Sequence, residues 1–105
     1  MANTAKALFR GAATTTLTTN LYTVPSATTA VITSIVVANT AASAGTFTLS
    51  IGPAGSEVAL FDAVAIAADT TTVIDLKQVL AATEVIDGGA SATTINFHIS
   101  GMEIA

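Results

Sequence analysis

The chain has 105 residues, of which 51% are hydrophobic and only 10% are charged, with a formal net charge of -4 and no cysteine. This hydrophobicity excludes an intrinsically disordered chain, and the absence of cysteine excludes a disulfide scaffold or a thiolate metal site. The acidic charge balance argues against nucleic acid as the main partner.

The N-terminal 16 residues differ in composition from the rest of the chain. They hold two of the three basic residues around a small apolar patch. We predict an extended arm over residues 1–16 that adds a strand to a neighbouring chain, with Leu8, Phe9 and Arg10 as its partner-binding residues. A frayed terminus, or the first strand of the domain itself, is the alternative. Residues 17–105 are expected to form a single β-sandwich domain.

Three β-strands are predicted in the first half of the chain. Residues 21–24 indicate a strand that Pro25 ends, because proline has no N–H to give to a ladder. The almost wholly apolar residues 31–37 indicate a central strand, followed by a loop of small residues at 39–45. Residues 45–51 alternate between apolar and hydroxyl side chains, which is typical of a half-buried antiparallel strand.

Further short strands are predicted in the second half. Residues 57–61 and 63–66 are two candidates separated by a break near Asp62, and residues 71–76 are another. The clearest alternation after residue 51 lies at 94–99, where three apolar side chains share one face. Thr, Val and Ile are abundant throughout, and β-branched residues favour the pleated surface of a sheet.

The remaining segments fit more than one type of element. Residues 75–86 fit either a short helix or strands, with a weak strand at 85–87. Two glycines after Asp87 predict a chain reversal at 87–89. A kink such as a β-bulge is expected at 100–101, because the apolar period beyond it is shifted. Together these elements predict an all-β fold, an antiparallel β-sandwich, jelly-roll-like, with about eight short strands.

The distribution of charge predicts association with other chains. No charged residue occurs from Gly11 to Ser56, whereas soluble monomers use about 25–35% charged surface residues to stay apart. An obligate oligomer or a particle-bound subunit is therefore expected. No apolar run approaches the roughly 20 residues of a membrane-spanning helix, and no signal-peptide pattern is expected at the N-terminus.

The residue inventory predicts neither catalysis nor a cofactor or metal. His98 is the only histidine, and it lies in an alternating strand. The functional hypothesis for this residue is a pH-sensitive contact within an assembly. The seven acids form no calcium-loop motif, and neither the glycines at 52 and 55 nor those at 88 and 89 are followed by lysine as in a P-loop. Tyr22 and four phenylalanines are the only aromatic residues that could form a carbohydrate-binding platform, since the sequence has no tryptophan. Two threonine runs leave ice binding as a remote alternative.

Two segments carry a resemblance to known proteins. Residues 21–50, LYTVPSATTAVITSIVVANTAASAGTFTLS, and residues 95–104, INFHISGMEI, resemble a recurring pattern in small all-β virion proteins of tailed bacteriophages. Together the two segments cover somewhat under half of the chain. Thr83–Glu84–Val85 departs from the pattern, since these proteins often have a Gly-Asp pair there.

The resemblance implies a non-enzymatic structural protein of the virion. Such proteins are β-sandwich or jelly-roll domains, often trimeric, that decorate or cement the capsid. The expected partners are the major capsid protein and copies of the chain itself in a homotrimer, and the expected location is the capsid surface after synthesis in the host cytoplasm. A tail, neck or fibre component is the alternative, and a carbohydrate-binding β module is a remote one.

Overall fold

The computed structural model describes residues 3–105, which form eight β-strands and no helix. The strands are β1 (Asn3–Ala12), β2 (Asn20–Thr23), β3 (Thr29–Asn39), β4 (Gly45–Gly52), β5 (Val58–Ile66), β6 (Thr70–Leu80), β7 (Val85–Ala90) and β8 (Ile95–Ile104). All six pairings between these strands are antiparallel. The predicted all-β class is therefore confirmed.

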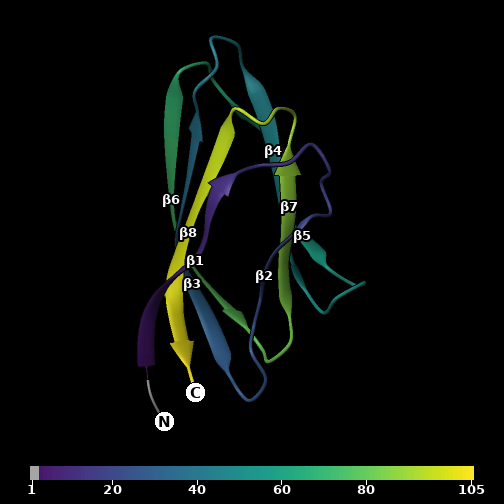
Figure 1. Cartoon of the computed structure of the whole chain (residues 1–105), viewed down its shortest axis with the longest axis vertical. Coiled ribbons are helices and arrows are strands. Elements are labelled where there is room, and N and C mark those ends of the chain that lie inside the picture. The colour runs from purple at the N-terminus through teal and green to yellow at the C-terminus, as the bar shows by residue number, and fades with distance from the viewer. Residues whose placement is uncertain (1–2) are drawn as a thin grey trace.

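The strands form a sandwich of two sheets. Sheet A has the order β1-β8-β3-β6 and sheet B the order β2-β7-β4-β5. In Figure 1, sheet A lies on the left and sheet B on the right, with their inner faces turned toward each other. Strand 1 pairs with 8, 2 with 7, 3 with 6 and 4 with 5, a nested order that we interpret as a rolled-up antiparallel hairpin. The jelly-roll description remains an interpretation of this order.

The core lies where the inner faces of β3, β4 and β8 meet. Phe47 of β4 packs edge-on against Phe97 of β8, with ring centroids 6.1 Å apart. Ile95, Phe97 and Ile99 are fully buried, and so is Leu49, as the alternation predicts. The strand at 31–37 lies between β8 and β6, in the middle of sheet A, which confirms its predicted central position.

The N-terminal arm is not seen. Residues Asn3–Ala12 pair with β8 as an edge strand of the chain's own sheet A. This is the alternative in which the segment is the first strand of the domain, so no boundary separates it from residues 17–105. The first two residues of the expected arm lie outside the described range. The physical reason is that Leu8 and Phe9 find a place to bury within their own sandwich.

Bulges at two edge strands turn pairs of consecutive apolar side chains into the sandwich. In β1 the register shifts between Ala7 and Phe9, so both Leu8 and Phe9 face the core. In β5 the register shifts twice, and Leu60 and Phe61 both pack against the core. An extra residue in one strand of a pair produces this effect. The expected break near Asp62 is therefore a bulge inside one strand rather than a gap between two.

Strand β7 overturns the expected chain reversal at 87–89. Asp87, Gly88 and Gly89 lie inside this strand, whose six residues are all buried. A Cβ on Gly88 would lie 2.4 Å from the Thr48 carbonyl oxygen, and one on Gly89 would lie 2.5 Å from the Thr16 carbonyl oxygen. The glycines therefore permit close approach of the neighbouring strand β4 and of the loop after β1 rather than a turn.

The threonine run that follows β1 forms the outer cover of β7. The Gly88 N–H donates to the Thr19 carbonyl and the Ala90 N–H to the Thr14 carbonyl, both at 2.9 Å. Within the loop the Thr14 and Thr19 hydroxyls bond each other and the Thr16 carbonyl. These threonines form an irregular loop that satisfies its own polar groups, not a flat hydroxyl array.

Strand β8 keeps its phase beyond residue 99, contrary to the shift expected at 100–101. Gly101 is buried, and Glu103 pairs with the buried Ala30, so both face inward. The irregularity lies in the neighbouring strands, where β1 and β3 each carry an extra residue opposite this point of β8. The helical alternative at 75–86 is wrong as well, since β6 and β7 occupy most of that segment.

A methyl group at Gly101 should destabilise the fold. Its Cβ would lie 2.1 Å from the Val31 carbonyl oxygen, which requires the backbone of β3 to move. We expect Gly101→Ala to lower the free energy of unfolding by about 1–3 kcal/mol or more, measured by urea denaturation. Gly11→Ala is the matched control in the same sheet, because its Cβ would meet only the Phe9 ring at 3.5 Å. Equal losses in the two variants would contradict this account.

Candidate interaction surfaces

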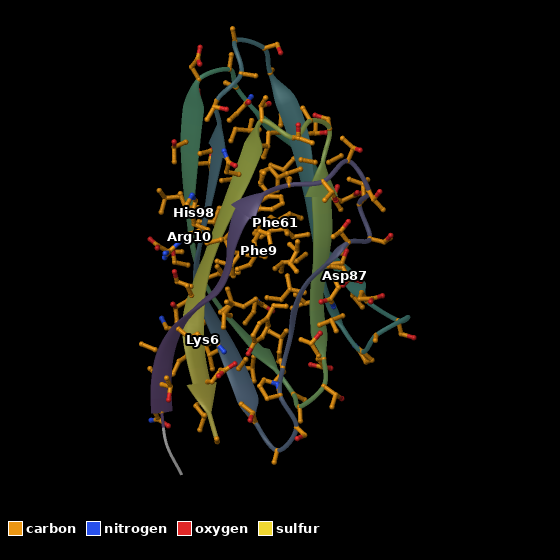
Figure 2. The ribbon with its side chains drawn as sticks, in the orientation of Figure 1. Lys6, Phe9, Arg10, Phe61, Asp87 and His98 are labelled. Atoms are coloured by element: carbon orange, nitrogen blue, oxygen red, sulfur yellow. The ribbon has the colours of Figure 1, made fainter. Side chains whose placement is uncertain are left out.

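The three residues expected to bind a partner do not share one surface. Leu8 is 6% exposed and belongs to the core, and Phe9 packs partly buried against it. Arg10 is exposed and lies opposite His98 on the outer side of sheet A. Figure 2 shows this division, with Phe9 directed between the sheets and Arg10 and His98 on the outside. Of the three, only Arg10 is exposed.

The outer face of sheet A is mostly uncharged. One row across its four strands runs Arg10, His98, Val36 and Val73. A second row, toward the other end of the strands, runs Ala5, Met102, Val31 and Val79. Hydroxyl groups of Ser34 and Ser100 lie between these rows. Charge is therefore confined to the two edge strands, with Arg10 on β1 and the Asp75 and Lys77 side chains on β6.

Exposed aliphatic side chains lie on edge strands of both sheets. Among the described residues, five large hydrophobic side chains are exposed, and four of them come from edge strands β5 and β6. We call these four residues the β5–β6 flank: Val58, Val64, Val73 and Val79. Val73 and Val79 are 64% and 67% exposed. Beside them, a pocket of about 570 Å³ is lined by Thr33, Asp75, Leu76 and Lys77.

A polar cluster links the two sheets at one end of the sandwich. The buried Tyr22 of β2 donates its hydroxyl hydrogen to Glu103 of β8, and the Lys6 ammonium lies 3.4 Å from the same carboxylate. Burial, then the bond to Glu103 and its charge, raises the pKa of Tyr22 well above its usual range. The Tyr22 bond, supported by Lys6, lowers the pKa of Glu103. The cluster ties sheet B to sheet A and leaves Glu103 ionised.

An acidic pair lies on the outer side of sheet B. Asp87 of β7 is 9% exposed, and the Asn20 amide donates to its carboxylate at 3.4 Å. Glu57, in the loop between β4 and β5, accepts from the Gly55 N–H at 3.2 Å, and it shares a proton with Asp87 when that carboxyl is protonated. Burial, then the bond and the negative charge of Glu57, raises the pKa of Asp87 to about 6. The bond from Asp87 lowers the pKa of Glu57.

Neither cluster groups enough ligands for a metal ion. Within residues 3–105, no three His, Asp or Glu side chains are grouped so as to hold a metal ion. His98 stands on the outer face beside Arg10 and Val36 rather than in a cleft. No helix in the same range is long and apolar enough to cross a membrane.

The aromatic side chains do not form a binding platform in the part of the chain described. Tyr22 is buried with its hydroxyl bonded, and Phe47 and Phe97 are at most 1% exposed. Phe9 and Phe61 are partly buried against the core. Stacking on a sugar needs an exposed ring face. This arrangement disfavours the carbohydrate-binding alternative.

The chain matches no protein-family model, and no curated protein is significantly similar to it in sequence.

Sequence reasoning missed both polar clusters and the β5–β6 flank. The inward position of Glu103 could have been found by continuing the alternation of Ile95, Phe97 and Ile99 without a break. The flank had a visible signal too, since β6 alternates regularly from Thr72 to Val79. The burial of Asp87 had none, because the glycines beside it erase the alternation.

The stability of the protein should fall as pH rises through the Asp87 titration. The folded-state pKa is raised to about 6 from an unfolded value near 4, so the folded state binds more protons between these limits. Stability from this group is therefore fully present below about pH 4 and is lost as pH approaches 6 and above. We expect Asp87→Asn to raise the unfolding midpoint at pH 8, with little gain at pH 4, measured by thermal denaturation.

The control for this prediction is Asp62→Asn. Asp62 is an exposed carboxyl on β5, so its replacement makes the same change in charge without relieving a buried pair. An Asp87→Asn variant that is less stable than the wild type at pH 8 would contradict the assignment.

Proposed function

We propose that the protein is a non-enzymatic structural subunit of a bacteriophage particle, a capsid decoration or cement protein that bridges major capsid subunits. A tail, neck or fibre component is the alternative within the same class. The protein would be made in the host cytoplasm and act on the capsid surface. Bridging several shell subunits makes the binding multivalent, so that modest contacts add up to a durable clamp.

The β5–β6 flank carries the proposal. Aliphatic side chains exposed on the edge strands of both sheets are costly for a free monomer and mark surfaces that other chains cover. The outer face of sheet A adds a broad, nearly uncharged surface on the same molecule. A subunit that works by covering its surface against neighbours needs these features and needs no reactive site.

The residues that carry the phage resemblance are structural elements of the sandwich. Residues 21–50 supply most of β2, all of β3 and most of β4, and residues 95–104 are strand β8. They include the buried Phe47 and Phe97, which pack against each other in the core. The resemblance therefore concerns the framework of the domain, which supports a shared architecture rather than a shared catalytic site.

The proposal predicts that the protein travels with phage particles. In density-gradient fractions of a lysate from its producing host, antibody against the chain should detect it with DNA-filled particles. Gold-labelled antibody should mark the heads in electron micrographs. Label on tails or fibres would select the alternative placement.

Two controls make the result decisive. Free purified chain, run on a parallel gradient, shows where unbound protein sediments. Particles of an unrelated phage mixed with the purified chain show how much adheres without specificity. Recovery of the protein only with free soluble proteins, from a lysate that contains intact particles, would reject the virion role.

A further inference from the structure

Strand β6 is the longest edge strand among the described strands, and its register against β3 shifts between Gln78 and Asp75. Edge strand β1 is interrupted by the bulge at Leu8, β5 by two bulges, and β2 has only four residues and is followed by Pro25. β6 spans eleven residues without proline or glycine, and its alternation of more and less exposed positions is unbroken from Thr72 to Val79. Such an edge presents a row of unpaired N–H and C=O groups to another strand.

The exposed side of this strand is self-complementary. The exposed positions are arranged symmetrically about Leu76. An aspartate at 75 and a lysine at 77 lie one residue to either side, and valines at 73 and 79 lie three residues to either side. All four of these side chains are exposed. In an antiparallel pair of identical strands centred on Leu76, each aspartate faces the lysine of the other copy, and each Val73 faces a Val79. Opposite charges and aliphatic pairs at directly facing positions stabilise antiparallel sheets.

We propose that two copies of this chain pair antiparallel along β6, about a two-fold axis at Leu76, and so join their A sheets into one continuous eight-stranded sheet. The contact is isologous, because residue 75 meets residue 77 and residue 77 meets residue 75. It closes two copies, and so differs from the homotrimer that the phage resemblance implies. It deepens the proposed function by naming one partner chain, and it rests on the assembly role but not on the virion.

The charges select this register over its neighbours. A shift that keeps the outer faces together must change the pairing by two residues, because side chains alternate between the faces. One such shift places Asp75 opposite Asp75 of the second copy, and the other places Lys77 opposite Lys77. Like charges directly opposite each other destabilise a sheet. Both neighbouring registers are therefore disfavoured. Of these three registers, only the pairing centred on Leu76 places opposite charges directly across from each other.

The space beside the strand fits the same partner. The 570 Å³ pocket lined by Thr33, Asp75, Leu76 and Lys77 lies at the midpoint of the edge, where the two-fold axis would pass. Side chains of the second copy would enter this space at its own Leu76 and Lys77. The half-buried Ile74 and Leu76, which pack only partly against the core, would gain cover from the second strand.

Charge reversal tests the pairing in purified protein. By light scattering after gel filtration, the wild-type chain should have about twice its 10.4 kDa mass. Asp75→Lys gives each strand two lysines, and Lys77→Asp gives each strand two aspartates. Each single variant should self-associate at least about tenfold more weakly, because two pairs of like charges then face each other. Both sites are exposed, so circular dichroism should show unchanged strand content.

Recombination of the variants separates this interface from any other. An equimolar mixture of Asp75→Lys chains and Lys77→Asp chains should form a heterodimer, since the lysines of one strand face the aspartates of the other. The double variant Asp75→Lys/Lys77→Asp should recover the homodimer. Asp62→Lys makes the same change in charge on exposed β5 and should leave the wild-type association unchanged.

Three results would overturn the pairing. They are a wild-type chain that stays monomeric at about 100 µM, a stable mass of three chains, and single variants that dimerise as well as the wild type. These results concern the purified chain alone. They are therefore distinguishable from failure of the virion role, which the particle gradients report separately.

Discussion

Close backbone packing around β7 is the constraint on which the sandwich depends. All six residues of this strand are buried, although the outer face of its sheet could face solvent. Its inner neighbours are core side chains, and its outer cover is the threonine loop that follows β1. Gly88 and Gly89 make both approaches possible, because any side chain there would meet a carbonyl oxygen at about 2.5 Å or less. The path from β1 into β2 is therefore fixed by contacts made on β7.

This constraint explains which elements the sequence could predict. A strand buried on one face alternates between apolar and polar residues, so the strands at 45–51 and 94–99 can be predicted from the sequence. β7 is covered on both faces. Its glycines have no side chains, so its sequence shows no alternation from which the orientation of the strand could be predicted. Its Asp-Gly-Gly sequence is also typical of a turn, and only the tertiary approach of Thr48 and Thr16 decides between the two readings.

The candidate surfaces were predictable to a smaller extent, again for a physical reason. Leu8 and Phe9 formed an apolar patch at the chain end, which suggested a partner outside the domain. A bulge lets both of them face inward, and local sequence does not specify where an extra residue enters a ladder. Arg10, the third residue expected to bind a partner, is exposed, since a cation is rarely buried unpaired. The sequence thus indicated which polar residues are exposed, but it did not indicate against which part of the structure each apolar residue packs.

The scarcity of charge and the placement of the few charges belong to one design. An uncharged outer face can approach another surface with little desolvation cost, but it carries little information about register. In the proposed pairing, the oppositely charged residues of β6 would supply that information at the edge, where the Val73 and Val79 side chains alone would allow sliding. Joining two A sheets would then double the uncharged outer face while keeping it on one side of the assembly. A flat, two-fold surface of this kind presents each contact twice, so weak individual contacts with an extended partner reinforce each other.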